Sequence, residues 1–256
     1  MTDKNSSRHI GVRPIGGRPI GGRPIGVFDS GVGGLTCAKE LLKLVPNENM
    51  IYLGDTARMP YGVNTKETLV GYTNDDVDFL QRRDVKLIVV ACGTVSSNVP
   101  ANQIKNLSVP YIDVISPTIS AAVKATKNKR IGIIATPATI KSGSFEQRLK
   151  MFDKDIETVS QGAPQLVTLV QDGYIDEDNF VTNNVCREYL APIKAFGVDT
   201  LILGCTHYPL LLPKIKTYMP NHIQIVSQGE LVAHSLKDYL HRKRIYRYLK
   251  VLLNMK

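Results

Sequence analysis

Two stretches in opposite halves of the chain each end an apolar run with a cysteine. They are Leu87-Ile-Val-Val-Ala-Cys-Gly-Thr94 and Leu201-Ile-Leu-Gly-Cys-Thr-His207, and a threonine follows each cysteine within two positions. A residue at the carboxyl end of a buried parallel strand faces the crevice where α/β proteins bind ligands. Two thiols, one from each half, therefore predict a site with a sulfur on each side of the substrate. Such a site suits an enzyme that removes a proton from one face and returns one to the other.

Cys92 and Cys205 both precede predicted helix N-termini, where the local positive potential favours the thiolate and lowers the pKa of a thiol. The other two cysteines, Cys37 and Cys186, are interpreted as packing residues, because cysteine is among the most buried residue types. His207 follows Cys205 by two positions, so a Cys–His hydrolase dyad that leaves Cys92 idle is an alternative. Four ligands at the spacing of a zinc site cannot be assembled, so no metal is expected.

Three further loops carry groups that could serve such a site. Asp29-Ser-Gly-Val-Gly-Gly34 places a carboxylate at a strand end, where it could orient or deprotonate a neighbour. The loop lacks the third glycine of a dinucleotide fingerprint and the Gly-Lys-Ser/Thr of a P-loop, and on its own it is interpreted as a strand-to-helix turn. Arg58-Met-Pro-Tyr-Gly62 is either a plain turn or a cradle of amides for a carboxylate. Thr136 and Thr139 follow another strand and add hydroxyls.

Strand-like runs alternate with amphipathic patterns, which is typical of parallel sheets covered by helices on both faces. We expect strands at 25–28, 50–53, 87–91, 111–115, 131–135, 201–203 and 223–226. We expect helices at 35–44, 65–82, 118–126, 144–151, 178–195 (with an interruption at Pro192) and 230–254. The chain is predicted to cross between its halves at Ser116-Pro117, and its last helix to pack back on one half.

The net charge of +9 resides in the two ends of the chain. Residues 1–24 hold five Lys and Arg against one Asp, and residues 237–256 hold seven against one. The rest is close to neutral, so we interpret the basic ends as solvated and expect contact with nucleic acid, if any, to be secondary. The N-terminus repeats Gly-Val-Arg-Pro-Ile and Gly-Gly-Arg-Pro-Ile, which predicts a flexible extension over 1–22.

Composition also restricts the class of protein. No apolar run is long enough to cross a bilayer, and the N-terminus lacks the apolar region of a secretory signal. The four cysteines have no disulfide-like spacing. We therefore expect a globular, cytoplasmic protein with free thiols and without a membrane partner.

Taken together, these motifs resemble those of the cofactor-independent glutamate racemases of bacterial cell-wall synthesis. The resemblance covers nearly everything from Pro24 onward. It rests on five motifs in the family's order, which are Ile25-Gly-Val-Phe-Asp-Ser-Gly-Val-Gly-Gly-Leu35, Leu53-Gly-Asp-Thr-Ala-Arg-Met-Pro-Tyr-Gly62, Ala91-Cys-Gly-Thr94, Ile134-Ala-Thr-Pro-Ala-Thr-Ile-Lys-Ser-Gly143 and Gly204-Cys-Thr-His-Tyr-Pro-Leu210.

The resemblance implies two pseudo-symmetric α/β domains with mainly parallel sheets and the active site at their interface. These domains would be 23–116 plus 228–256, and 117–227. Cys92 and Cys205 would be the two acid/base residues in the interconversion of L- and D-glutamate for peptidoglycan, with Asp29 and His207 assisting and no cofactor. The substrate-binding residues would be Asp29, Ser30, Pro60, Tyr61, Gly62, Gly93, Thr94, Thr136, Thr139, Cys205, Thr206 and His207.

Two positions depart from the family pattern. Members usually have a substrate-contacting asparagine after the first catalytic cysteine, where this chain has Gly93. They also usually carry a glutamate where this chain has Gln171, with Asp172 next to it as a candidate substitute. The change at Gly93 makes a racemase of aspartate or another amino acid the alternative. The resemblance further implies a homodimer, and contact with a topoisomerase-like partner through the basic ends is a lesser alternative.

Overall fold

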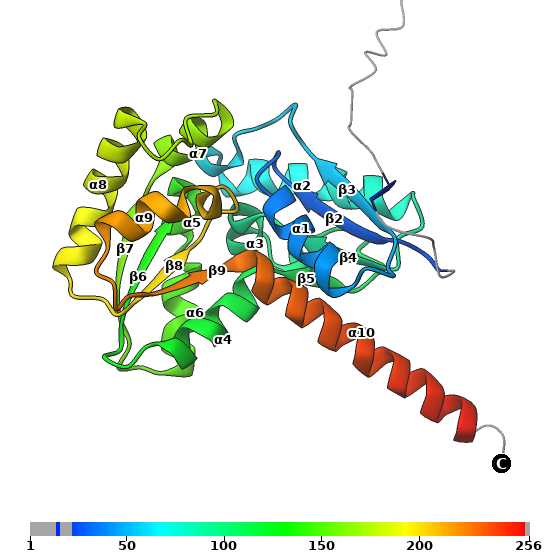
Figure 1. Cartoon of the computed structure of the whole chain (residues 1–256). Helices are drawn as coiled ribbons and strands as arrows, with labels where there is room; N and C mark the ends of the chain where they lie inside the picture. Colours follow the sequence, from blue (N-terminus) through cyan, green and yellow to red (C-terminus); the bar gives the residue numbers. More distant parts are fainter. Residues whose placement is uncertain (1–13, 16–21, 254–256) are drawn as a thin grey trace, which may run out of the picture.

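The computed structural model describes residues 14–15 and 22–253 and contains two sheets (Figure 1). The first has the order β1-β3-β2-β4-β5. Its parallel strands are β2 (Ile25–Asp29), β3 (Met50–Gly54), β4 (Leu87–Val90) and β5 (Tyr111–Asp113), and the two-residue β1 (Pro14–Ile15) pairs antiparallel with β3. Every residue of β2 and β4 is buried, as expected for central strands covered on both faces. The rest of the predicted 1–22 extension, apart from Gly22, lies outside the described residues.

The second sheet has the order β7-β6-β8-β9 and is parallel throughout. It consists of β6 (Arg130–Ala135), β7 (Glu157–Gly162), β8 (Thr200–Leu203) and β9 (Gln224–Ser227). The edge strand β7 was not among the predicted strands. Its sequence, Glu-Thr-Val-Ser-Gln-Gly, is polar and none of its residues is fully buried, so it lacks the apolar run by which the other strands are found.

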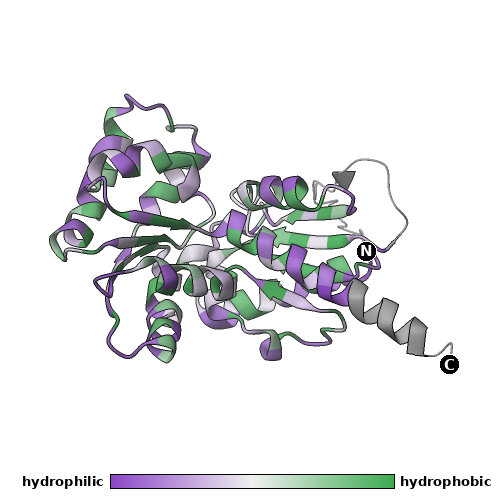
Figure 2. Cartoon of the chain, turned by 60° about the horizontal axis from the view of Figure 1, so that its bottom comes forward, coloured by the Kyte–Doolittle hydropathy of each residue, from purple (hydrophilic) through white to green (hydrophobic). Residues whose placement is uncertain are grey.

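Helices cover both faces of each sheet. On the first sheet, α1 (Leu35–Leu44) and α10 (Gln228–Leu253) pack together on one face, and α2 (Lys66–Gln81) and α3 (Gly93–Asn98) contribute to the core on the other. On the second sheet, α7 (Pro164–Gln171), α8 (Phe180–Ala195) and α9 (Leu212–Tyr218) share one core. The remaining helices are α4 (Ile115–Ala125), α5 (Pro137–Ser142) and α6 (Ser144–Phe152). Figure 2 shows apolar residues concentrated in the strands and polar residues banding the helices.

The chain passes between the sheets twice. Ser116 and Pro117 lie in the first turn of α4, so the first passage is a helix that begins earlier than the sequence predicts. The second passage runs from β9 directly into α10, which returns to α1 through Val232 and Leu236. One buried core therefore includes residues of both sheets, and the α/β architecture with two mainly parallel sheets is confirmed.

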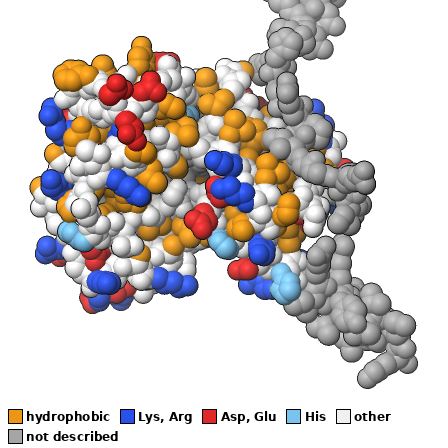
Figure 3. All heavy atoms as spheres, in the orientation of Figure 1, with side chains coloured by type: hydrophobic (Ala, Val, Ile, Leu, Met, Phe, Trp, Pro, Cys, Tyr) orange, Lys and Arg blue, Asp and Glu red, His pale blue; other side chains and the backbone are white. Residues whose placement is uncertain are grey.

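The helix α8 continues through Pro192, so the interruption expected there is wrong. Pro192 sits in the last turn of the helix, where a missing amide removes only one late hydrogen bond. Within the described residues no helix is long and apolar enough to span a membrane. Basic and acidic side chains are interspersed on the face of the molecule that Figure 3 displays.

Candidate active site

Both cysteines of the predicted pair line one cavity between the carboxyl ends of the two sheets. Cys92 comes two residues after β4, and Cys205 comes two residues after β8. The cavity has a volume of about 150 Å³. Its lining includes eleven of the residues expected from the sequence, namely Ser30, Pro60, Tyr61, Gly62, Cys92, Gly93, Thr94, Thr136, Cys205, Thr206 and His207. Residues more than one hundred positions apart in the chain are thus brought to a single site.

Cys92 is placed by the turn from β4 into α3, for which it is the N-cap residue. Its Sγ lies 3.6 Å from the Ser30 hydroxyl oxygen. Asp29 is fully buried and does not line the cavity. Its Oδ2 accepts hydrogen bonds from the amides of Gly31 (3.2 Å) and Gly34 (2.9 Å), whereas its Oδ1 has no partner among the described residues.

The glycine-rich loop after β2 therefore directs two of its amides to the carboxylate of Asp29, the last residue of β2. On its own the loop was interpreted as a strand-to-helix turn, and it performs that role. It also holds Asp29 by one oxygen and leaves the other available to accept a proton. A buried acceptor without a partner is costly, which makes Oδ1 a candidate for proton transfer.

Cys205 has a different neighbour. Its Sγ lies 3.6 Å from Nδ1 of His207, and Nε2 of the same ring lies 3.3 Å from the Gln171 amide nitrogen. An amide NH₂ only donates, so in this orientation of Gln171 the His207 Nε2 accepts and Nδ1 carries the proton toward sulfur. Gln171, where the resemblance leads us to expect a glutamate, is therefore in contact with His207. Asp172, the candidate substitute, is exposed and follows the end of α7.

Burial dominates the ionisation of the site. It raises the pKa of Cys92 to about 12, with the Asp29 charge adding to the effect, and it raises the pKa of Cys205 as well. The expectation of thiol pKa values lowered by helix N-termini is therefore wrong, because the loss of solvation outweighs the nearby backbone dipoles. Burial also raises the pKa of Asp29 and lowers the pKa of His207, each opposed by the attraction between the two groups.

Hydroxyl groups from both sheets meet on another wall. Thr94 and Thr136 share a hydrogen bond of 2.9 Å, and Thr136 and Thr139 share one of 3.0 Å. Thr136 caps α5 and lines the cavity. Thr139 is fully buried and does not line it. Within this structure its hydroxyl supports Thr136, in place of the direct contact with substrate expected from the sequence.

The loop after β3 supplies a further wall through Pro60, Tyr61 and Gly62. The Tyr61 hydroxyl hydrogen bonds to Asp55 (2.5 Å) and Asp76 (3.0 Å), neither of which lines this cavity. What the loop presents to the cavity is therefore its backbone and the ring. Because proline has no amide hydrogen, the predicted cradle of amides would have to use Tyr61 and Gly62.

The two halves approach so closely that side chains would not fit at several glycines, of which Gly62 and Gly93 line the cavity. A Cβ on Gly93 would overlap the carbonyl oxygen of Gly204, and a Cβ on Gly62 would lie 2.6 Å from the Thr136 Cβ. Both contacts join a loop of the first sheet to one of the second. Gly93 is thus required by a close approach between the two cysteine-bearing strand ends.

Sequence reasoning missed the wall formed by α7. The cavity is also lined by Val63, Pro137, Pro164, Gln165, Val167, Thr168 and Gln171, of which only Gln171 had been noted. A proline at the first turn of a helix was the available signal for α7. Among the described residues, no cluster of three or more His, Cys, Asp and Glu side chains is placed to hold a metal ion.

Comparison with known proteins agrees with this geometry. Residues 26–235 match the model of the Asp/Glu/Hydantoin racemase family. The chain is 45% identical to a glutamate racemase of Sulfurihydrogenibium sp. over 83% of this chain and 81% of that protein. It is 45% identical to one of Enterococcus faecalis over 79% of this chain and 74% of that protein.

Solved structures give the same result. A glutamate racemase isoform from Bacillus anthracis superposes with a TM-score of 0.82 at 39% identity, covering 86% of this chain and 82% of that one. Glutamate racemase from Francisella tularensis in complex with D-glutamate gives 0.81 at 33% identity, covering 87% and 82%. With two cysteines lining one cavity and a match over residues 26–235, the chain belongs to the Asp/Glu/Hydantoin racemase family.

Proposed function

We propose that this racemase interconverts L- and D-glutamate, with Cys92 and Cys205 as its two acid/base groups. The observation that carries the proposal is that thiols from the two sheets line one cavity of about 150 Å³. The relatives at 45% identity are glutamate racemases, which supports glutamate as the substrate. An aspartate racemase from Picrophilus torridus is only 20% identical, and it shares the fold alone.

The reaction needs one thiolate and one thiol at its start. The thiolate removes the proton from Cα, and the opposite thiol gives its proton to the other face of Cα. The two sulfurs have then exchanged protonation states and the configuration is inverted. Since both thiols are protonated in the empty site, one proton must first move to a neighbour. Asp29, through its partnerless Oδ1, would accept it beside Cys92. The Nδ1–H of His207 would donate a hydrogen bond to the Cys205 sulfur and stabilise its thiolate form.

Substrate groups would be held by the polar lining. The hydroxyls of Ser30, Thr94, Thr136 and Thr206 and the amides of Tyr61 and Gly62 suit two carboxylates and an ammonium. Fixed dipoles in a site from which water is excluded stabilise the carbanion character that develops at Cα. The proposed proton transfers use only the two thiols, Asp29 and His207, and the proposed substrate binding uses only the hydroxyls and amides named above.

The proposal also covers the domain boundaries, the cellular role and the oligomeric state of the protein. We assign residues 23–116 plus 228–256 to one domain and 117–227 to the other. The product would serve peptidoglycan synthesis in the cytoplasm, where free thiols stay reduced, and the chain would act as a homodimer.

The proposal is tested by circular dichroism of the purified protein with L-glutamate and separately with L-aspartate, without added cofactor. We expect the signal to decay to zero with glutamate. In heavy water, deuterium should appear at Cα of the product. If the signal decayed with aspartate and not with glutamate, aspartate would be the substrate. If neither amino acid exchanged its Cα proton, racemisation would be contradicted. Hydrolysis of an ester or amide substrate that survives loss of Cys92 would favour the Cys–His alternative.

A further inference from the structure

The Tyr61 hydroxyl lies between two buried carboxyl groups. Its oxygen is 2.5 Å from Asp55 Oδ2 and 3.0 Å from Asp76 Oδ2. Asp76, on α2, is 3% exposed and Asp55 is 9% exposed. A phenol has a single proton and can donate to one carboxylate only. The second contact is a hydrogen bond only if that carboxyl group carries a proton of its own.

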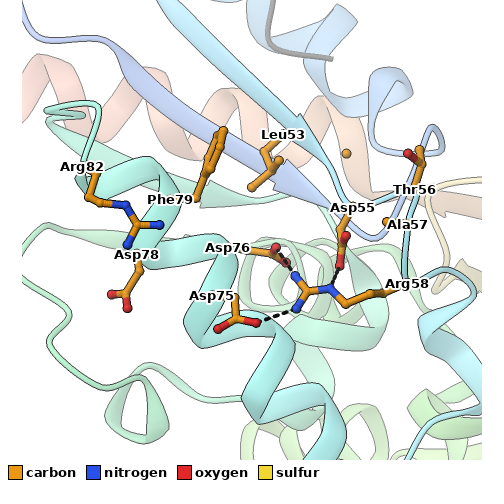
Figure 4. Close-up of a pocket in the computed structure, with 11 residues that line it drawn as sticks. Leu53, Asp55, Thr56, Ala57, Arg58, Asp75, Asp76, Asp78, Phe79 and Arg82 are labelled. Carbon is orange, nitrogen blue, oxygen red and sulfur yellow. Dashed lines mark hydrogen bonds and ion pairs between the residues drawn. The ribbon is translucent and has the colours of Figure 1, made fainter. Parts of the chain in front are cut away.

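Arg58 also contacts both of these carboxyl groups (Figure 4). Its guanidinium donates to Asp55, to Asp75 (2.6 Å) and to Asp76 Oδ1 (2.8 Å). Asp76 therefore faces the guanidinium with one oxygen and the phenol with the other. One cation serves three carboxyl groups, and the Asp75 side chain is 71% exposed and screened by water. The two buried carboxyl groups compete for one charge.

The physical surroundings identify Asp76 as the group that holds the proton. Burial and the neighbouring Asp55 raise the pKa of Asp76 to about 7, although Arg58 and the hydrogen bond with Tyr61 oppose the shift. Burial and Asp76 also raise the pKa of Tyr61, so the phenol keeps its proton. The ionisable groups facing Asp76 are Asp55, Arg58 and Tyr61 from the loop after β3, and Asp75 from its own helix. The neighbouring helix α3 (Gly93–Asn98) carries no ionisable side chain.

We propose that Asp76 is a positioning residue that acts as a carboxylic acid, donating from Oδ2 to the Tyr61 oxygen and so holding the loop 58–62 in place for substrate. Tyr61 then donates to Asp55, which completes a chain of hydrogen bonds. The inference rests on the proposed function, because Pro60, Tyr61 and Gly62 form a wall of the cysteine cavity.

Ionisation of Asp76 would break this chain. Two carboxylates would face one phenol proton, and the repulsion would loosen Tyr61 and the loop that follows it. Gly62 packs against Thr136 of the second half, so a loosened loop would disturb both the substrate wall and the contact between the halves. We expect this to weaken substrate binding and to leave the cysteines themselves unchanged.

Water can reach the network without opening the cysteine site. A separate cavity of about 370 Å³ is bordered by Arg58, Asp75 and Asp76 and extends to Phe79 and Arg82 (Figure 4). Asp76 can therefore exchange its proton with solvent on the side away from the cysteine cavity. The state of the loop would follow the pH of the solution.

The central test is Asp76→Asn. The amide NH₂ donates to the Tyr61 oxygen as the acid does, and the amide oxygen accepts from Arg58. We expect the KM of this variant for glutamate to match the parent within about threefold at pH 6, where the acid is protonated. Above pH 7 the ratio of parent KM to variant KM should rise by up to about tenfold per pH unit, with little change in the kcat ratio. Because the thiols and the substrate titrate in the same way in the parent and the variant, their effects on KM cancel in this ratio.

Two further variants complete the design. Asp75→Asn removes the exposed partner of the same guanidinium and the smallest of the contributions that raise the pKa of Asp76. It should keep the rise of KM with pH and move it only slightly toward lower pH. Asp76→Ala removes the donor and should raise KM at every pH. If Asp76→Asn is as impaired as Asp76→Ala at pH 6, Asp76 is needed as an anion and the proposal is wrong. A KM ratio that stays flat between pH 6 and 8.5 would overturn it as well.

A measurement without substrate separates this proposal from the function on which it rests. The pKa of Asp76 is about 7 in the folded protein, above its ordinary value of 3.8. The unfolded chain loses this proton first as pH rises, so the contribution to stability is complete below about pH 4 and is lost as pH approaches 7. Urea unfolding should show parent stability falling relative to Asp76→Asn across that window. Parallel curves would contradict the protonated acid, whereas a parent inactive on glutamate at all pH values would contradict only the proposed function.

Discussion

The two cysteine-bearing strand ends have the same backbone plan and different partners for the thiol. Cys92, after β4, has the buried carboxyl group of Asp29 and the hydroxyl of Ser30. Cys205, after β8, has the imidazole of His207, which is in turn held by Gln171. One sulfur therefore has a carboxyl group beside it, and the other has an imidazole.

Burial reduces the chemical difference between the two sides. It raises the pKa of the Asp29 carboxyl group and lowers the pKa of the His207 imidazole. Both partners are thereby moved toward their uncharged forms and toward each other in proton affinity. A nearly symmetric reaction does not need symmetric residues, because desolvation acts in opposite directions on acids and bases. The predictions below test how far this equivalence holds.

The largest effects should come from the thiols. Cys92→Ser and Cys205→Ser should each reduce racemisation by about 10³-fold or more, since a hydroxyl is a poor acid and base under these conditions. Each variant should still exchange the Cα proton of one enantiomer with heavy water and retain its configuration, because one thiol remains on one face. The exchanging enantiomer should differ between the two variants. Exchange of both enantiomers by either variant would contradict a two-thiol mechanism.

Loss of a partner should slow one face more than the other. We expect Asp29→Asn and His207→Asn each to reduce kcat by about 10²-fold. The primary isotope effect with α-deuterated glutamate should increase for one enantiomer in Asp29→Asn and for the other in His207→Asn. Equal increases for both enantiomers in each variant would show that the two partners act together on one step.

Adding a side chain at Gly93, where the two cysteine-bearing strand ends touch, should push the two halves apart. In Gly93→Ala the new Cβ would overlap the carbonyl oxygen of Gly204, so the loops must move and the thiols with them. We expect a loss of about tenfold to 10²-fold in kcat/KM, given the sensitivity of such sites to misplacement. Gly71→Ala is the matched control, because a Cβ there meets nothing within 4 Å. It should keep full activity and gain about 0.5 to 1 kcal/mol in the free energy of unfolding.

The smallest effect should come from Gln171→Glu. A carboxylate accepts from His207 Nε2–H, which reverses the tautomer and turns Nδ1 into an acceptor for the Cys205 proton. The added charge should raise the pKa of His207, and the pH profile of kcat should shift upward with a change in kcat of about threefold to tenfold. Titration of His207 by NMR checks the direction. An unchanged pKa would show that residue 171 does not set the state of the ring.

The predictable features were those with a local pattern. The strands β4 and β8 appear as apolar runs with small residues and a cysteine at their ends, so their place beside a crevice followed from the chain alone. The polar edge strand β7 and the short helix α7 did not, because their patterns depend on what covers them. The sequence led us to expect Asp29 and Thr139 to contact substrate, but both are buried behind the surface of the cavity. Asp29 lies behind Cys92, and Thr139 lies behind Thr136.

The sequence by itself determined which groups are available and that two thiols end strands of two parallel sheets. Its resemblance to the family also led us to expect an asparagine at the position of Gly93 and a glutamate at the position of Gln171. Only the tertiary structure decided their states: thiols with raised pKa values, an Asp29 oxygen without a partner, and a Tyr61 hydroxyl turned away from the cysteine cavity toward Asp76. The reason is physical. Ionisation and hydrogen bonding depend on desolvation and on neighbours from distant parts of the chain, and no local pattern of residues specifies either.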